Sequence, residues 1–336
     1  MRGIIRILCK NKLTGFTVSA VGAVVICGAL AGWSVDRPAR AAPDWIAPPQ
    51  DELAMLRNQV ANIDDEMHDV VSEDGLHELL HGTSYALSKI RRGDARVPRI
   101  FVESLPTDFG AQMVVEERKR TFIRTILPLI LKVNEEVQAE RRRLIALEEH
   151  VSSGHDLLKD EQVWLDGLAH KYRVAPSDFA ALLRRVDGVS PTLALAQSIE
   201  ESGWGRSRFA REGNALFGQR AWSAGAGLVP EERAEGERFE VRAFDSLLDS
   251  VRSYVGNLNR HYAYEDYRFA RAQMRAYDAR LDTRTLARTL VNYSERREDY
   301  VNALIGLIET NRLDDFELAR LSTEPFDLNA VQLAAR

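Results

Sequence analysis

Cysteine is nearly absent from this chain of 336 residues. The two cysteines, Cys9 and Cys27, both lie in the N-terminal leader. The rest of the chain therefore has no disulfide framework, no cysteine nucleophile and no thiolate metal site available to it.

The chain also lacks a strong charge of either sign, internal repeats and low-complexity tracts. Its formal net charge of -5 gives no reason to expect a nucleic-acid partner. Hydrophobic residues at 45% and charged residues at 28% are typical of globular proteins, which argues against wholesale disorder and against a multi-span membrane protein.

One long uncharged, mostly apolar run extends from Leu13 to Trp33, and basic residues precede it: Arg2, Arg6, Lys10 and Lys12. At 1.5 Å per residue, a helix of this length crosses a hydrocarbon core of roughly 30 Å. We predict that residues 1–35 are a membrane anchor or a signal peptide, since Ala39 and Ala41 resemble a cleavage site. Either interpretation exports the rest of the chain to the periplasm, and a retained anchor makes the cytoplasmic membrane a partner.

The remaining sequence divides into four predicted parts. They are a proline-rich linker at 36–50, a helical accessory region at 51–153, a main domain at 154–312 and a C-terminal tail at 313–336. The accessory region contains a long helix that we expect to be bent or interrupted near Pro128.

Within the main domain, Ser190 and Pro191 are typical of a helix start, and the helix should end near Gly203. Glu200 and Glu201 then lie at the helix end and point about 100° apart, so they cannot share one environment. Between Gly225 and Phe244 the residues alternate in polarity around a turn, which predicts a small hairpin.

Glu201 precedes Ser202-Gly203-Trp204-Gly205. A glutamate partly buried near aromatic rings keeps its proton near neutral pH, because desolvation disfavours the charged form. Glycoside hydrolysis needs such an acid to protonate the leaving oxygen. Taken alone, however, a glutamate at a helix end is usually a solvated or capping residue.

The segments from Leu195 to Ser207 and from Asn214 to Gly218 resemble the signature of glycoside hydrolase family 73, which comprises beta-N-acetylglucosaminidases. Upstream segments, including Val97 to Phe101, are similar to its Bax-type branch. This resemblance extends from about Val97 to about Glu309.

The resemblance implies a mainly α, lysozyme-like helical domain with a small β-hairpin lobe. It also implies cleavage of the beta-1,4 bond between N-acetylglucosamine and N-acetylmuramic acid in peptidoglycan, without a cofactor. Glu201 matches the family's catalytic acid, and Tyr293 matches a tyrosine of its cleft, although Glu295 replaces the threonine usual nearby. Expected substrate-binding residues are Trp204, Asn214, Phe217, Trp222 and Tyr300, but tryptophans are equally often packing residues.

A second catalytic group is still required, because Glu201 cannot also activate water on the opposite face of the sugar. The predicted hairpin contains Glu231, Glu232, Glu235 and Glu237. We choose Glu235 as the second catalytic group, since its place before Gly236 suggests a turn over the cleft. One alternative is that these glutamates are only a solvated charge cluster. Another is that the substrate's own acetamido group assists the reaction.

A competing motif, His77-Glu78-Leu79-Leu80-His81, fits the H-E-x-x-H pattern of zinc peptidases. Leu87 stands where an extended motif needs a third histidine, and Glu103 lacks the expected context. We therefore predict no metal site. A non-catalytic peptidoglycan-binding protein remains the alternative to an endo-acting glucosaminidase.

Overall fold

The computed structural model describes residues 65–81, 83, 85–221, 225–230, 239–277 and 280–326. The predicted leader and linker lie outside these residues. Within them, no helix combines the length and apolarity needed to cross a membrane.

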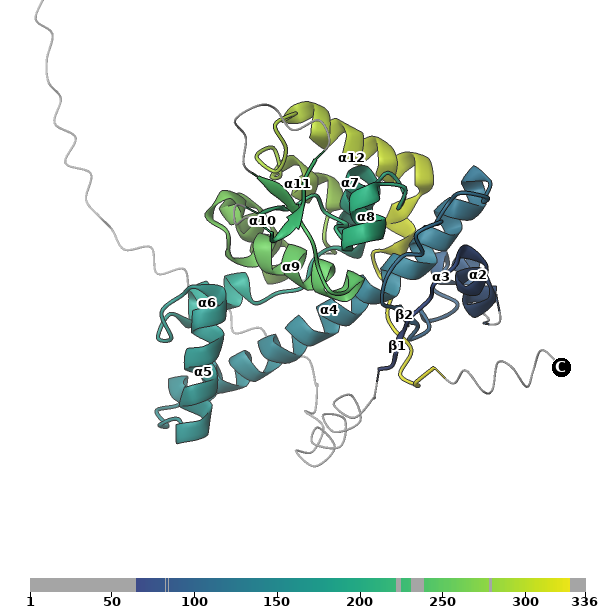
Figure 1. The fold of residues 1–336 in the computed structure, drawn as a ribbon. Helices are drawn as coiled ribbons and strands as arrows, with labels where there is room; N and C mark the ends of the chain where they lie inside the picture. Colours follow the sequence, from purple (N-terminus) through teal and green to yellow (C-terminus); the bar gives the residue numbers. More distant parts are fainter. Residues whose placement is uncertain are drawn as a thin grey trace, which may run out of the picture. The chain divides into compact units, whose positions relative to one another are not determined.

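Helices dominate the described part of the chain, as predicted, and the strands are short (Figure 1). The helices are α2 (Glu73–His81), α3 (Leu87–Arg91), α4 (Val115–Ser152), α5 (Lys159–Tyr172), α6 (Phe179–Arg185), α7 (Pro191–Ser202), α8 (Arg208–Gly213), α9 (Leu247–Arg260), α10 (Glu265–Ala276), α11 (Thr283–Arg288) and α12 (Glu298–Asn311). Short 3-10 helices are η1 (Tyr262–Tyr264) and η2 (Leu313–Phe316). The strands are β1 (Met67–His68), β2 (Phe101–Val102), β3 (Arg220–Ala221), β4 (Gly227–Leu228) and β5 (Glu240–Arg242).

Helix α7 is the central helix, and its residues from Pro191 to Ile199 are all buried. Its sequence signals work as predicted. The Ser190 hydroxyl accepts a hydrogen bond from the Leu193 amide at 3.1 Å, and Gly203 ends the helix in a left-handed conformation with φ of 58°. Helices α4, α11 and α12 pack around α7, which fixes the position of its last turn (Figure 1).

Helix α4 is 38 residues long and continues through Pro128, so the expected interruption does not occur. A proline removes one backbone donor and strains the preceding turn. Here Ile126, Leu127, Leu129 and Ile130 around it are all buried, and this packing holds the helix together. Because α4 packs against α7 and α9, the segments on both sides of the predicted boundary at 153–154 share one hydrophobic core.

The predicted hairpin is present as antiparallel β4 and β5, and β3 adds a third strand in the order β3-β5-β4. The sequence did not predict β3, because two residues are too few to show alternation. Gly227 permits the tight pairing of β4 with β5, since a Cβ there would lie 2.0 Å from the Val241 carbonyl oxygen. Residues 231–238, with the four candidate glutamates, lie outside the described residues.

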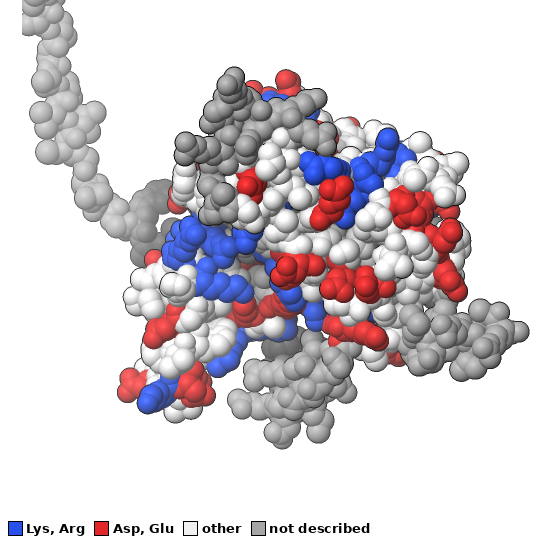
Figure 2. All heavy atoms as spheres, in the orientation of Figure 1, with Lys and Arg blue, Asp and Glu red and all other residues white. Residues whose placement is uncertain are grey.

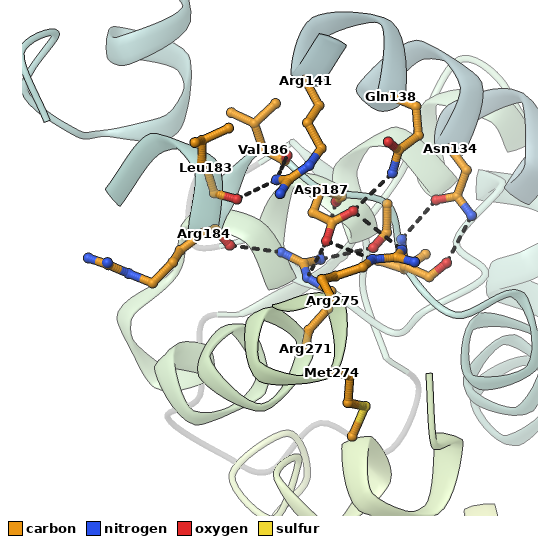
Figure 3. Close-up of polar contacts among 12 residues, drawn as sticks. Asn134, Gln138, Arg141, Leu183, Arg184, Val186, Asp187, Arg271, Met274 and Arg275 are labelled. Atoms are coloured by element: carbon orange, nitrogen blue, oxygen red, sulfur yellow. Dashed lines mark hydrogen bonds and ion pairs between the residues drawn. The ribbon is translucent and has the colours of Figure 1, made fainter. Parts of the chain in front are cut away.

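A buried polar network centred on Asp187 holds the segment that leads into α7 (Figure 3). From α4, the Gln138 amide donates to Asp187 Oδ1 at 2.9 Å. From α10, Arg275 Nε donates to Asp187 Oδ2 at 3.2 Å. The fully buried Arg271 lies 3.6 Å from the same carboxylate.

The backbone of this segment is equally well bonded. Arg271 donates to the carbonyl oxygen of Gly188 at 3.1 Å, and Asn134 of α4 makes two hydrogen bonds of 2.8 Å with the backbone of Val189. The accessory helix α4 and the distant α10 therefore together fix the start of the central helix.

Candidate active site

A cleft of about 820 Å³ lies in the described part of the molecule, and three of the predicted site residues line it: Glu201, Phe217 and Tyr293. A smaller cavity of about 450 Å³, lined by Asp65 and Lys132 among others, contains none of them. The cleft is therefore the candidate active site.

Glu201 lies in the last turn of α7 and its side chain is half-buried. Burial raises its pKa to about 7; the interaction with the Tyr300 hydroxyl and the charge of Arg296 oppose this shift, whereas Glu200 adds to it. The helix C-terminus carries partial negative charge and likewise disfavours the carboxylate. A substantial fraction of Glu201 is consequently protonated at neutral pH, as a general acid requires.

Glu200 has the separate environment that the helix geometry predicts. It forms an ion pair with Arg296 near the surface, and it is not among the described residues that line the cleft. The adjacent glutamates on α7 therefore have different partners.

A hydrogen-bonded chain lies beneath Glu201. The fully buried Gln197 donates to the Tyr300 hydroxyl at 2.9 Å and accepts from the Tyr254 hydroxyl at 2.7 Å. Tyr300 in turn interacts with the Glu201 carboxyl. Gln197 was not predicted, although its spacing of four residues before Glu201 places both on one face of α7.

Tyr293 and Phe217 lie side by side in the cleft wall. The Tyr293 hydroxyl donates to the Phe217 carbonyl oxygen at 3.1 Å, and the Phe217 ring stacks on Tyr254 with centroids 4.0 Å apart. Tyr293 also stacks on Tyr300 at 5.5 Å. Glu295, the departure from the family pattern, also lines the cleft and pairs with Arg220 at 2.9 Å.

Other predicted binding residues lie away from the described cleft lining. The Trp204 ring packs edge-on against Phe122 of α4, 6.0 Å between centroids. Asn214 is buried and donates to the carbonyl oxygens of Phe244 and Asp245. These contacts are structural ones, and the predicted sugar contacts of both residues stay untested.

Tyr300 is buried next to Glu201 and is not among the described residues of the cleft lining, so its predicted contact with sugar stays a prediction. Trp222 and Glu235 lie outside the described residues. Among the described residues of the lining, Glu201 and Glu295 are the residues that carry carboxylates. The role of Glu235 as second catalytic group therefore stays a prediction.

Gly218 faces Glu201 across the cleft floor. A Cβ at residue 218 would lie 2.8 Å from Glu201 Oε2, and the glycine has φ of 57°. The absence of a side chain at this position therefore leaves room for the Glu201 carboxyl group.

We expect Gly218→Ala to lower turnover by about 10²-fold, because the added methyl group displaces the Glu201 carboxyl by up to an ångström. Gly154→Ala is the matched control: it has φ of 84° but open space around its Cβ. Both variants should lose about 1 kcal/mol of unfolding free energy from backbone strain. Initial rates of glycan cleavage and urea unfolding separate the two effects, and equal rates in the two variants would contradict the role of this contact.

The H-E-x-x-H segment has a third candidate ligand that the sequence did not indicate. Glu117 of α4 joins His77 and His81 of α2, with all ligand atoms within 4.8 Å of one another. His77 Nε2 lies 3.2 Å from Glu117 Oε1. A missing third ligand is therefore no longer a reason to exclude zinc, and the absence of a metal site stays a prediction. None of the three residues lines the cleft.

We still expect glycan cleavage to be independent of zinc, since the acid Glu201 lies in the cleft and the histidines do not. Treatment with a chelator should leave the cleavage rate unchanged, as should His77→Ala. If chelation abolished activity and zinc restored it only in the protein with His77 intact, the prediction would fail.

Comparison with known proteins points to one family. Residues 177–313 match the glucosaminidase family, described as mannosyl-glycoprotein endo-beta-N-acetylglucosaminidase. Protein bax of Escherichia coli (strain K12) is 31% identical over 201 residues, which cover 58% of this chain and 70% of that protein. Exo-glucosaminidase LytG of Bacillus subtilis (strain 168) is 27% identical over 191 residues, covering 54% and 62%. No solved structure matches the chain.

A mainly helical protein with a half-buried, partly protonated glutamate in an open cleft has the features of a glycoside hydrolase. The family can be stated as well. The chain belongs to the glucosaminidase family, as the segments around Glu201 predicted.

Proposed function

We propose that this protein cleaves the beta-1,4 bond between N-acetylglucosamine and N-acetylmuramic acid within peptidoglycan glycan strands. The observation that carries the proposal is the raised pKa of Glu201 in the cleft. Family membership supports glycosidase activity, and the relative named as a glucosaminidase supports the sugar.

In the proposed reaction the protonated Glu201 gives its proton to the glycosidic oxygen as the bond from the N-acetylglucosamine C1 breaks. Water adds to C1 and releases a proton, which the second group accepts. If the substrate's acetamido group assists instead, its oxygen first bonds to C1, and water then displaces it and gives its proton to the Glu201 carboxylate. Tyr293 faces the reacting sugar and helps to position it. The hydrogen bond from the Tyr293 hydroxyl to the Phe217 carbonyl oxygen holds the tyrosine in place. We keep Glu235 as the proposed second group.

Digestion of purified sacculi, followed by mass spectrometry of the released fragments, tests this function. N-acetylglucosamine should occupy the new reducing ends. Long fragments early in digestion indicate endo cleavage, whereas small fragments of constant size from the start indicate the exo action named for the Bacillus relative. Binding to sacculi without any cleavage would favour the non-catalytic alternative.

We further propose that the protein acts in the cell envelope, exported by its residues 1–35. A reporter enzyme fused after Gln50 should be active outside the cytoplasm. A control fusion that lacks residues 2–35 should remain inside. Equal activity of the two fusions in the cytoplasm would contradict export by this segment.

A further inference from the structure

The lining of the cleft is strongly basic. Six arginines contribute to it, namely Arg173, Arg220, Arg242, Arg260, Arg296 and Arg297. Two of them are neutralised by carboxylates of the chain itself: Arg220 pairs with Glu295, and Arg296 pairs with Glu200. Arg297 donates to the Asn292 side chain at 2.6 Å.

The other three form a cluster that we call the triple-arginine wall: Arg173, Arg242 and Arg260. They come from three separate elements, since Arg173 follows α5, Arg242 ends β5 and Arg260 ends α9. Within the described part of the chain, none of the three forms an ion pair with a carboxylate. Figure 2 shows basic side chains gathered next to α6 on the side toward α9 and α10.

The three guanidinium groups lie close enough to repel one another. Burial lowers the pKa of Arg260, and the charges of Arg173 and Arg242 lower it further. The C-termini of α5 and α9 offset part of this cost for Arg173 and Arg260, but Arg242 lies in a strand and has no such partner. Uncompensated positive charge in a cleft favours an anionic ligand.

A glycan backbone of N-acetylated sugars offers no negative charge of its own. In peptidoglycan the charges are carboxylates, either on the peptide attached to muramic acid or on the lactyl group of muramic acid that lacks a peptide. Arginine suits these groups, because its planar fork binds a carboxylate with two parallel hydrogen bonds.

We propose that the triple-arginine wall binds carboxylates that branch from the glycan strand, next to the bond that Glu201 cleaves. The proposal rests on the proposed function for the choice of substrate. It assigns Arg173, Arg242 and Arg260 to recognition of the charged branches, whereas the sugar rings contact the floor around Glu201 and Phe217.

Binding measurements on protein that carries Glu201→Gln test the proposal without turnover. The probes are three soluble glycan fragments: one bearing its peptide, the same fragment with all carboxyl groups converted to amides, and a peptide-free fragment with a free lactyl group. The test variant adds Arg242→Gln and Arg260→Gln. The control adds Arg92→Gln, which removes an exposed arginine of the same charge outside the cleft.

The amidated fragment should bind about tenfold more weakly than the peptide-bearing one, and the test variant should lose that difference while the control keeps it. A loss confined to the peptide-free fragment identifies the lactyl carboxylate as the ligand, and a loss confined to the peptide-bearing fragment identifies the peptide. Losses for both mean that the triple-arginine wall accepts either carboxylate. Arg242→Lys with Arg260→Lys should restore part of the affinity. Unchanged affinity of the test variant for both acidic fragments would overturn the proposal.

Thermal unfolding of each variant checks the fold. If the double variant unfolds, Arg242→Gln alone carries the test, since this side chain is exposed. Cleavage of sacculi by the protein with Glu201 intact is measured in parallel. Arginine-dependent binding without cleavage would refute the glucosaminidase function alone, whereas cleavage with no arginine dependence would refute the carboxylate site alone.

Discussion

Glu201→Gln should reduce the rate of glycan cleavage by roughly 10³-fold, within the usual contribution of a general acid. Glutamine has the shape of glutamate, but its amide group does not release a proton at neutral pH. The substitution therefore leaves the cleft intact and removes the proton donor. The measurement is the initial rate of release of reducing ends from sacculi, together with the affinity for a soluble glycan fragment, which should change little.

Glu200→Gln is the matched control, because it changes the neighbouring residue of the same helix in the same way. Glu200 pairs with Arg296 and does not line the cleft. We expect its rate to stay within about threefold of the unmodified protein, in keeping with the small energy of an exposed ion pair. Equal rates for the two variants would overturn the assignment of the acid.

The direction of the Glu201 pKa shift can also be checked by stability measurements. Its folded value of about 7 exceeds the ordinary value of 4.5, so the folded protein binds the proton more tightly than the unfolded chain does. The folded state is therefore favoured below pH 4.5, and this advantage disappears as the pH rises through 7. Relative to the unmodified protein, Glu201→Gln should gain roughly 2–3 kcal/mol of unfolding free energy at pH 9 and nothing at pH 4. The cleavage rate should fall above pH 7 for the same reason.

Local sequence signals predicted the central helix and its acid. Ser190 caps the first turn of α7, and Gly203 ends the last one. Both signals are local in the sequence, and the position of Glu201 in the last turn follows from them. Pro128 shows the limit of such signals. Its local effect is to break a helix, but the buried side chains around it override that effect.

Contacts between distant segments could not be predicted in this way. Gln197 meets Tyr300 across 103 residues, and Glu117 reaches His77 only because α2 packs against α4. The triple-arginine wall joins three elements that have no shared pattern in the sequence. Each of these groupings depends on tertiary packing, which periodicity and caps do not encode.

Asp187→Ala should lower the unfolding free energy by about 3–5 kcal/mol, because removal of one member of a buried ion pair leaves the other charge without compensation. Arg271 is fully buried, 3.6 Å from the Asp187 carboxylate, and Arg275 shares the same oxygen (Figure 3). Burial alone would raise the pKa of Asp187, but Arg271, Arg275 and Arg141 outweigh it and lower the pKa below its ordinary value of 3.8. The stabilisation by this carboxylate is therefore present above pH 3.8 and is lost as the pH falls through the folded value.

Asp94→Ala is the control that separates the effect of burying an ion pair from the effect of the distance between its charges. Asp94 pairs with Arg92 at 2.7 Å, closer than Asp187 lies to either of its arginines, but both side chains are more than half exposed. Its loss should cost less than 1 kcal/mol, since water screens the pair and replaces its hydrogen bonds. Urea unfolding at pH 7 measures both variants. Similar costs for the two would mean that the Asp187 network does not hold the start of α7. The position of Glu201 at the other end of that helix would then depend on the packing of α7 against its neighbouring helices, α4, α11 and α12 among them.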